Sequence, residues 1–345
     1  MAIIRKESRR NVVEMAELRV KNIFNNGLPV YLSFSGGKDS LAIAQVVYSL
    51  IQRGEINPAQ LTVNFIDEEA IYPCIERTVK EWRKKFMLVG ATFNWYCVEV
   101  LHFNALNSLT TDETFICWDR YKRDVWVREK PSFAISHHPL LKARRDSYQE
   151  FLERIEADGI TITGVRVAES FQRLKNFSIS KRKDKLHPIY DWKDTDVWLY
   201  LYEQGVKIPE VYLYLYQTGK NRQDLRVSQF FSSDTVGSLV SMNEFYPDLM
   251  ERIKRREPNA YLVSLYWDTE MFRRNTRRRR QLEKQGEKKD YKAELWKLLS
   301  NINANFNTKN QRNVARRYRS LMLKTDGLAT EKHYKRMYEA LIGGD

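Results

Sequence analysis

Short apolar runs alternate with longer amphipathic stretches along much of the chain. The runs typical of strands cover residues 30–32, 61–66, 92–100 and 160–163. The stretches with apolar side chains at helical spacing cover residues 5–26, 41–51, 74–86, 140–157 and 195–204. Because strands that alternate with helices in this way form parallel sheets, the pattern predicts an α/β fold with a doubly wound, mostly parallel sheet.

The pattern changes near residue 218, where the strand signals fade. Residues 219–345 read as helices and carry basic runs at 252–256 and 273–280. We therefore expect a basic helical C-terminal extension after an α/β domain of residues 28–218, with residues 1–27 as an N-terminal helix. A chain of 345 residues is long enough for one core domain and an appendage.

Residues 102–140 interrupt the alternation inside the α/β domain. They carry Cys117, Trp118 and a His137-His138 pair among many charges. A segment this long is usually functional or mobile, and its aromatic side chains suit a lid over a substrate. The two histidines lack a carboxylate or cysteine at ligand spacing, which favours a surface turn over a metal site.

A glycine-rich loop links the first predicted strand to the helix behind it. Its residues are Ser33, Phe34, Ser35, Gly36, Gly37, Lys38, Asp39 and Ser40. The glycines can take positive φ and bring backbone N–H groups close to an anion, and the following helix adds the positive end of its dipole. Walker A loops have a different spacing. The sequence therefore predicts a cradle for phosphate groups, with an ordinary glycine turn as the alternative.

Three carboxylates, Asp67, Glu68 and Glu69, close the second predicted strand. In doubly wound sheets the ligand binds beyond the carboxyl ends of the strands, so this segment should lie beside the glycine-rich loop. One interpretation is that Asp67 or Glu68 contacts substrate or Mg²⁺, with Asp39 and Asp67 as the metal ligands. The other is a solvated acidic start of a helix.

A second polar motif follows the fourth predicted strand. It comprises Gly164, Arg166, Glu169 and Ser170, with Arg173 close behind. Glycine lets the chain turn sharply, and a guanidinium at a strand end can pair bidentately with phosphate oxygens. We expect Arg166 to contact nucleotide phosphates and Glu169 to orient Arg166 or to approach the metal.

The formal net charge of +14 indicates a polyanionic partner or an anionic substrate, with a merely basic protein as the alternative. The basic candidates for contact with substrate or nucleic acid are Arg173, Lys181, Arg182, Lys183, Arg277, Arg278, Arg279 and Arg280. Solvated helix faces are the other interpretation of the C-terminal runs.

Three scattered cysteines argue against a disulfide framework, a zinc finger or a four-cysteine cluster. No apolar run approaches the length of a membrane span, and the N-terminal residues lack the apolar region of a signal peptide. These features predict a cytoplasmic protein without a membrane partner.

The SGGKDS loop resembles that of the PP-loop ATP pyrophosphatases. Residues 164–170 resemble the second motif of the PAPS reductase-like branch of this superfamily, and residues 188–198 are similar to a third family segment. The resemblance spans residues 28–215 and implies an adenine nucleotide α-hydrolase-like fold that binds ATP or PAPS with Mg²⁺. On the matching positions it implies catalytic roles for Lys38, Asp39 and Arg166.

Three functions stay open on this resemblance. The first is an enzyme that cleaves ATP between the α- and β-phosphates and adenylylates an acceptor for sulfur or nitrogen transfer, with DNA or tRNA as candidate substrates. The second is a PAPS-type sulfonucleotide reductase or sulfotransferase-like enzyme, but the family's C-terminal nucleophilic cysteine is missing, since no cysteine follows Cys117. The third is a nucleotide-sensing, nucleic-acid-binding co-activator without turnover, as in the IbrA-type PAPS-reductase-like proteins of phages and prophages, with a protein partner in addition.

Overall fold

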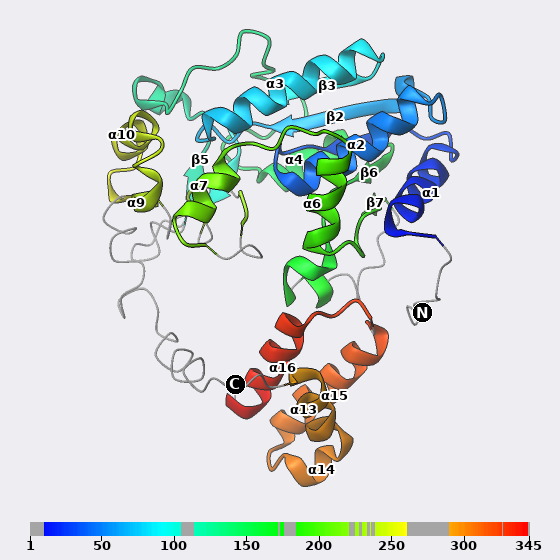
Figure 1. Cartoon of the computed structure of the whole chain (residues 1–345). Helices are drawn as coiled ribbons and strands as arrows, with labels where there is room; N and C mark the ends of the chain where they lie inside the picture. Colours follow the sequence, from blue (N-terminus) through cyan, green and yellow to red (C-terminus); the bar gives the residue numbers. More distant parts are fainter. Residues whose placement is uncertain are drawn as a thin grey trace.

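Five strands form one parallel sheet in the order β3-β2-β1-β6-β7 (Figure 1). They are β1 (Val30–Ser33), β2 (Leu61–Ile66), β3 (Thr92–Tyr96), β6 (Ile160–Ile162) and β7 (Lys185–Leu186). The chain runs outward from β1 to β3 and then crosses back to β6, so the strand order reverses between β1 and β6. This topology confirms the predicted α/β fold with a doubly wound parallel sheet.

The computed structural model describes residues 10–104, 114–171, 173–175, 184–220, 225–227, 230–232, 235, 239–260, 290–325 and 327–343. Within these residues no helix has the length and apolar character needed to cross a membrane.

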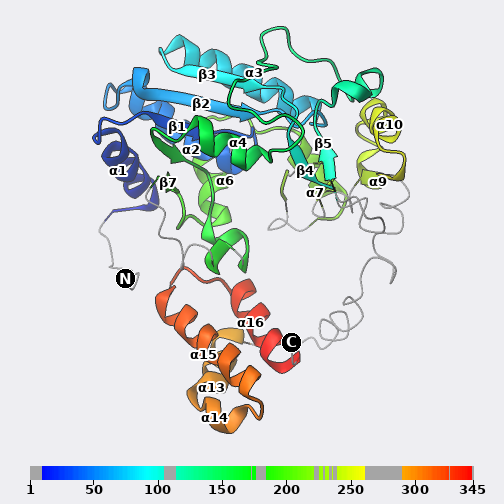
Figure 2. The same ribbon diagram turned by 180° about the vertical axis from the view of Figure 1, so that it is seen from behind.

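Helices cover both faces of the sheet. One face carries α1 (Val12–Phe24), α2 (Lys38–Gln52), α3 (Pro73–Leu88) and α6 (Asp194–Glu203) (Figure 1). Helix α2 packs between its neighbours, and Tyr48 meets the rings of Trp82 and Phe86 edge to face at 6.0 and 5.9 Å. The other face carries α4 (Tyr148–Ile155), seen from behind in Figure 2.

Two predicted elements are shorter than the apolar pattern suggests. The third strand ends at Tyr96 instead of residue 100, because its pairing with β2 stops where Tyr96 lies opposite Ile66. The helix expected from residue 140 begins only at Tyr148, where Ser147 and Glu150 form a capping box. Arg144 takes a φ of +64°, which a helix does not contain.

The described part of segment 102–140 is packed, in contrast to the lid expected from the sequence. Strand β4 (Leu101–Phe103) pairs antiparallel with β5 (Thr114–Ile116), and the 3₁₀ helix η3 (Arg120–Val125) follows. Trp118 is fully buried, and its Nε1 donates to the carbonyl oxygen of Asp67 at 2.6 Å. This segment therefore forms a wall against the end of β2.

The rest of the C-terminal half is helical in its described parts. Its helices are α7 (Val211–Gln217), α9 (Leu239–Met242), α10 (Pro247–Arg256), α13 (Tyr291–Ser300), α14 (Ile302–Asn305), α15 (Lys309–Lys324) and α16 (Glu331–Gly343). Helices α13 to α16 share a core of their own and lie below the sheet in Figure 1. They meet the α/β domain where the rings of Phe171 and Tyr318 lie 5.9 Å apart.

Candidate functional site

The glycine-rich loop lies where β1 ends and α2 begins, at the carboxyl edge of the sheet. Gly36 has a φ of +73°, and a Cβ there would lie 2.8 Å from Cγ2 of Val79 in α3. Both conditions require glycine. Gly37 is the N-cap of α2, so the N-terminus of this helix points out of the loop.

Two serine hydroxyls hold the loop in shape. Ser40 Oγ donates to the carbonyl oxygen of Gly37 at 2.9 Å and accepts from the N–H of Ser35 at 3.2 Å. Ser35 Oγ lies 3.1 Å from Ser40 Oγ and accepts from the N–H of Gly37 at 3.4 Å. The donors of the loop are therefore ordered before a ligand arrives, which lowers the entropic cost of binding.

Gly164 lets the end of β6 touch the start of α2. A Cβ at this position would lie 2.5 Å from the carbonyl oxygen of Asp39 and 2.9 Å from the backbone nitrogen of Ser40. Its φ is not among the positive values of the described glycines, so close approach, and not a sharp turn, requires glycine here. The second sequence motif thus packs directly against the first.

Arg166 joins the loop helix to α6. Its Nε donates to Asp39 Oδ1 at 2.6 Å, its Nη2 to Asp194 Oδ1 at 3.5 Å, and its Nη1 to the carbonyl oxygen of Trp192 at 3.4 Å. The side chain is 3% exposed. Arg166 therefore positions the Asp39 carboxylate from behind, which differs from the expected contact with nucleotide phosphates.

Lys38 is buried beneath the loop. Its Nζ donates to the carbonyl oxygen of Leu225 at 2.9 Å and lies 3.5 Å from Asp39 Oδ2 and from Asp194 Oδ1. Its backbone N–H donates to Tyr212 Oη at 2.7 Å. Sequence reasoning missed Asp194 and Tyr212 as partners of the loop, although Asp194 lies within the third family-like segment and Tyr212 follows it.

A cavity of about 1560 Å³ opens beside the loop. The predicted site residues that line it are Ser33, Phe34, Ser35, Gly37, Lys38, Asp39, Ser40, Gly164, Glu169 and Arg173. Gly36, Asp67, Arg166 and Ser170 are described but lie outside its lining. Lys181, Arg182, Lys183 and Arg277 to Arg280 lie outside the described residues. The volume is ample for a nucleotide with its phosphates.

Asp67 is buried away from this cavity. It is 0% exposed, accepts from Trp95 Nε1 at 2.7 Å and pairs with Arg128. Its placement differs from the expected contact with nucleotide or metal, because its oxygens are already bonded inside the protein. Within the described residues, no group of three His, Cys, Asp or Glu side chains is arranged to hold a metal ion.

Glu68 is the carboxylate of this segment that lines the cavity. Burial, together with the charge of Asp67, raises the pKa of Glu68 to about 8. His102 Nδ1 lies 3.8 Å from Glu68 Oε1, and burial lowers the pKa of His102 to about 4. The pair is therefore neutral at pH 7, and Glu68 is poised to exchange a proton near physiological pH.

A polar network covers the sheet face that forms the floor of the cavity. Asn64 Nδ2 and Thr161 Oγ1 donate to the two carboxylate oxygens of Glu156 at 2.9 and 2.7 Å. Thr163 Oγ1 lies 2.6 Å from His187 Nδ1, and burial with the nearby positive charges lowers the pKa of His187 to about 4. Sequence reasoning missed these residues, although Asn64 stands out as the polar position within an apolar strand.

The three cysteines, Cys74, Cys97 and Cys117, are unpaired and buried. Burial raises the pKa of each thiol. Thiols of this kind are poor nucleophiles, since the thiolate is the reactive form. Cys117, in the segment expected to form a lid, is 0% exposed and faces the carbonyl oxygen of Glu68.

The model of the phosphoadenosine phosphosulfate reductase domain matches residues 29–219, which is more than half of the chain. The chain belongs to this family. The match confirms the resemblance to the PAPS reductase-like branch that the loop and the motif after β6 carry.

An uncharacterized protein of Escherichia coli, YbdN, is 27% identical over 217 residues. The matched region covers 55% of this chain and 51% of that protein, so the chain spans about half the length of this relative.

Two solved structures are similar at low identity. The U34-tRNA thiolase NcsA from Methanococcus maripaludis is 12% identical with a TM-score of 0.35, over 73% of this chain and 78% of that chain. The PAPS reductase from Candida auris is 13% identical with a TM-score of 0.33, over 63% of this chain and 94% of that chain.

Proposed function

We propose that the cavity binds ATP with its phosphates against the glycine-rich loop and that the protein transfers the adenylyl group to an acceptor. The observation that carries this proposal is the loop itself, which is held open by Ser35 and Ser40 on the wall of a nucleotide-sized cavity. The N-terminus of α2 and the Nζ of Lys38 supply the positive field that anionic phosphates need. PAPS is the alternative nucleotide.

The proposed reaction is displacement at the α-phosphorus. An acceptor oxygen forms the new bond, the bond between the α-phosphorus and the bridging oxygen breaks, and pyrophosphate leaves. The carboxylate form of Glu68 takes the acceptor proton. Positioning and charge stabilisation would supply most of the rate, as in other phosphoryl and adenylyl transfers.

Mg²⁺ fits this cavity through carboxylate oxygens, which are its preferred protein ligands. Asp39 lines the cavity and would hold the ion together with phosphate oxygens, whereas the buried ion pair of Asp67 leaves no ligand there. When bound, the ion would neutralise charge on the departing pyrophosphate.

The adenylylated acceptor would next receive sulfur or nitrogen, and DNA or tRNA is the acceptor class that suits a chain with a net charge of +14. A PAPS reductase is the less favoured function, because all three cysteines are buried with raised pKa values. A nucleotide sensor without turnover is the second candidate, favoured by the full engagement of Lys38 with protein atoms.

The test measures pyrophosphate release from ATP and Mg²⁺ by the full chain, with tRNA or DNA present. Lys38→Ala should lower the rate by about 100-fold, on the scale of losing one group that stabilises developing charge. Lys21→Ala removes the same charge from an exposed pair with Glu55 and should leave the rate unchanged. Tight ATP binding without pyrophosphate favours the sensor, and sulfite release from PAPS with thioredoxin favours the reductase.

A further inference from the structure

Helix α15 carries a row of cations without carboxylate partners, although Arg316 Nη1 donates to Asn313 Oδ1 at 3.3 Å. Over its 16 residues it has no acidic side chain, and its basic ones are Lys309, Arg312, Arg316, Arg317, Arg319 and Lys324. In the described part of the chain none of the six forms an ion pair with a carboxylate. A helix of this length is about 24 Å long, so the six charges extend along the helix. We call this row of basic side chains the track.

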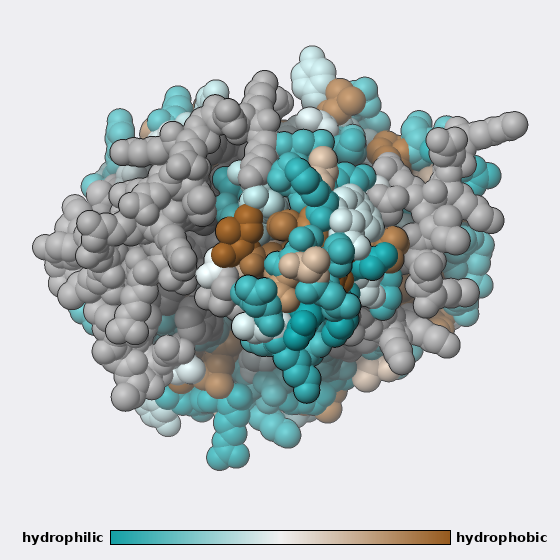
Figure 3. All heavy atoms as spheres, turned by 90° about the horizontal axis from the view of Figure 1, so that it is seen from below, coloured by the Kyte–Doolittle hydropathy of each residue, from teal (hydrophilic) through white to brown (hydrophobic). Residues whose placement is uncertain are grey.

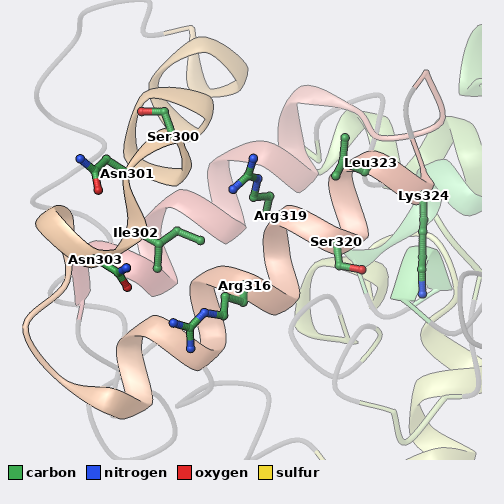
Figure 4. A pocket seen from close by; sticks show the side chains of 9 residues that line it. All are labelled: Ser300, Asn301, Ile302, Asn303, Arg316, Arg319, Ser320, Leu323 and Lys324. Carbon is green, nitrogen blue, oxygen red and sulfur yellow. The ribbon is translucent and has the colours of Figure 1, made fainter.

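A cavity of about 600 Å³ lies along this track, between α15 and the turn from α13 to α14 (Figure 4). Arg316 and Arg319 project from α15 on either side of Ile302 (Figure 4). Asn303 and Ser320 add neutral polar groups to the lining, and all of these side chains but Ile302 are exposed. No carboxylate of the described residues lines this cavity.

Viewed from below, the described C-terminal helices show hydrophilic side chains around a small apolar patch (Figure 3). A concave site that combines guanidinium groups, neutral donors and acceptors, and an apolar floor suits an unstacked nucleotide: the phosphate pairs with arginine and the base covers the apolar floor. A rigid duplex cannot place its bases into such a hollow. The neutral side chains Asn303 and Ser320 match the 2′-hydroxyl, which both donates and accepts.

We propose that α15 and its cavity bind a single strand of RNA through the phosphate backbone. Lys324, at the end of α15, lines both this cavity and the larger one beside the glycine-rich loop. In Figure 4 its side chain points away from Arg316 and toward the α/β domain. A strand that follows α15 therefore reaches the nucleotide cavity. That this RNA is also the acceptor of the adenylyl group rests on the proposed function.

The binding test uses fluorescence anisotropy with a labelled 20-nucleotide oligouridylate and the full chain, without ATP. The double variant R316Q/R319Q should bind about tenfold more weakly at low salt and should lower the slope of log Kd against log salt by about 1.4, since each lost contact with a single strand accounts for about 0.7. The control K84Q/K207Q removes the same charge from exposed positions outside both cavities and should match the wild type.

An unchanged salt slope in R316Q/R319Q overturns the docking surface, and tighter binding of the matching oligodeoxynucleotide or duplex overturns the assignment to single-stranded RNA. The proposed function fails separately, because RNA binding is measured without ATP. If the acceptor step is right, RNA stimulates pyrophosphate release by the wild type and not by R316Q/R319Q. If RNA still stimulates pyrophosphate release by the double variant, the proposed path of the RNA strand from α15 to the nucleotide cavity is wrong.

Discussion

Gly164 offers the sharpest test of how the two motifs make one site. In Gly164→Ala the new Cβ would lie 2.5 Å from the carbonyl oxygen of Asp39, about 0.9 Å short of ordinary contact, which begins near 3.4 Å. The atoms on both sides belong to the backbone, so no side-chain rotation relieves the overlap. The first turn of α2 must shift, and with it the hydrogen bond of 2.6 Å between Arg166 and Asp39.

The expected cost of this overpacking is about 1–3 kcal/mol of the free energy of unfolding. For an α/β domain of this size that corresponds to a fall in Tm of about 2–12 °C. The displaced loop should also lose at least one hydrogen bond to a charged phosphate, worth about 1.5–3 kcal/mol, so affinity for ATP should fall about 10- to 150-fold.

Gly159→Ala is the matched control, because it creates a similar clash at the other end of the same strand. A Cβ at Gly159 would lie 2.3 Å from the carbonyl oxygen of Pro29, which precedes β1 at the end of this strand opposite the loop. Thermal unfolding and calorimetric titration with α,β-methylene-ATP, which resists cleavage, separate the two effects. We expect both variants to lose stability and only Gly164→Ala to lose affinity; an equal loss of affinity in both would refute the reasoning.

Two further predictions follow from the titratable groups. The pKa of Glu68 is raised from 4.5 to about 8, so folding becomes less favourable as pH rises through this range, where the unfolded chain loses the proton first. Glu68→Gln should therefore raise Tm more at pH 8.5 than at pH 5.5. Equal shifts of Tm at the two pH values would contradict a raised pKa of Glu68. The buried cysteines should resist Ellman's reagent in the native protein and should all react in guanidinium. Rapid modification of any cysteine in the native protein would make it a candidate nucleophile again.

The sequence predicts the sheet and the loop because both depend on local patterns. The apolar runs mark the strands, and the two adjacent glycines mark a turn in which Gly36 takes the positive φ that a side chain rarely adopts. Strand ends are less predictable, since the pairing of β3 with β2 stops at Tyr96 although the apolar run continues to residue 100. That pairing is a tertiary contact with no signature in the run 92–100.

The roles of individual side chains depend on partners that lie far away in the sequence. Arg166 resembles a phosphate ligand in the motif, yet in the structure Asp39 and Asp194 occupy its guanidinium. Tyr212 lies 174 residues from Lys38 and still accepts its backbone N–H. Spacing alone cannot distinguish a side chain that touches the ligand from one that holds such a side chain in place.

The acidic triplet after β2 shows why this distinction matters for function. Glu69 has a φ of +66°, so the chain turns, and its N–H bonds to Asp67 Oδ1 at 3.0 Å. Asp67 pairs with Arg128, and Glu69 pairs at 2.9 Å with Arg256, which ties α10 to the sheet. Both buried pairs are structural, because removing one partner would leave an uncompensated charge. Glu68, between them, is therefore the carboxylate of the triplet that can contact a ligand in the cavity. The sequence shows three adjacent acidic residues, but two of them form structural ion pairs and only Glu68 is placed to react.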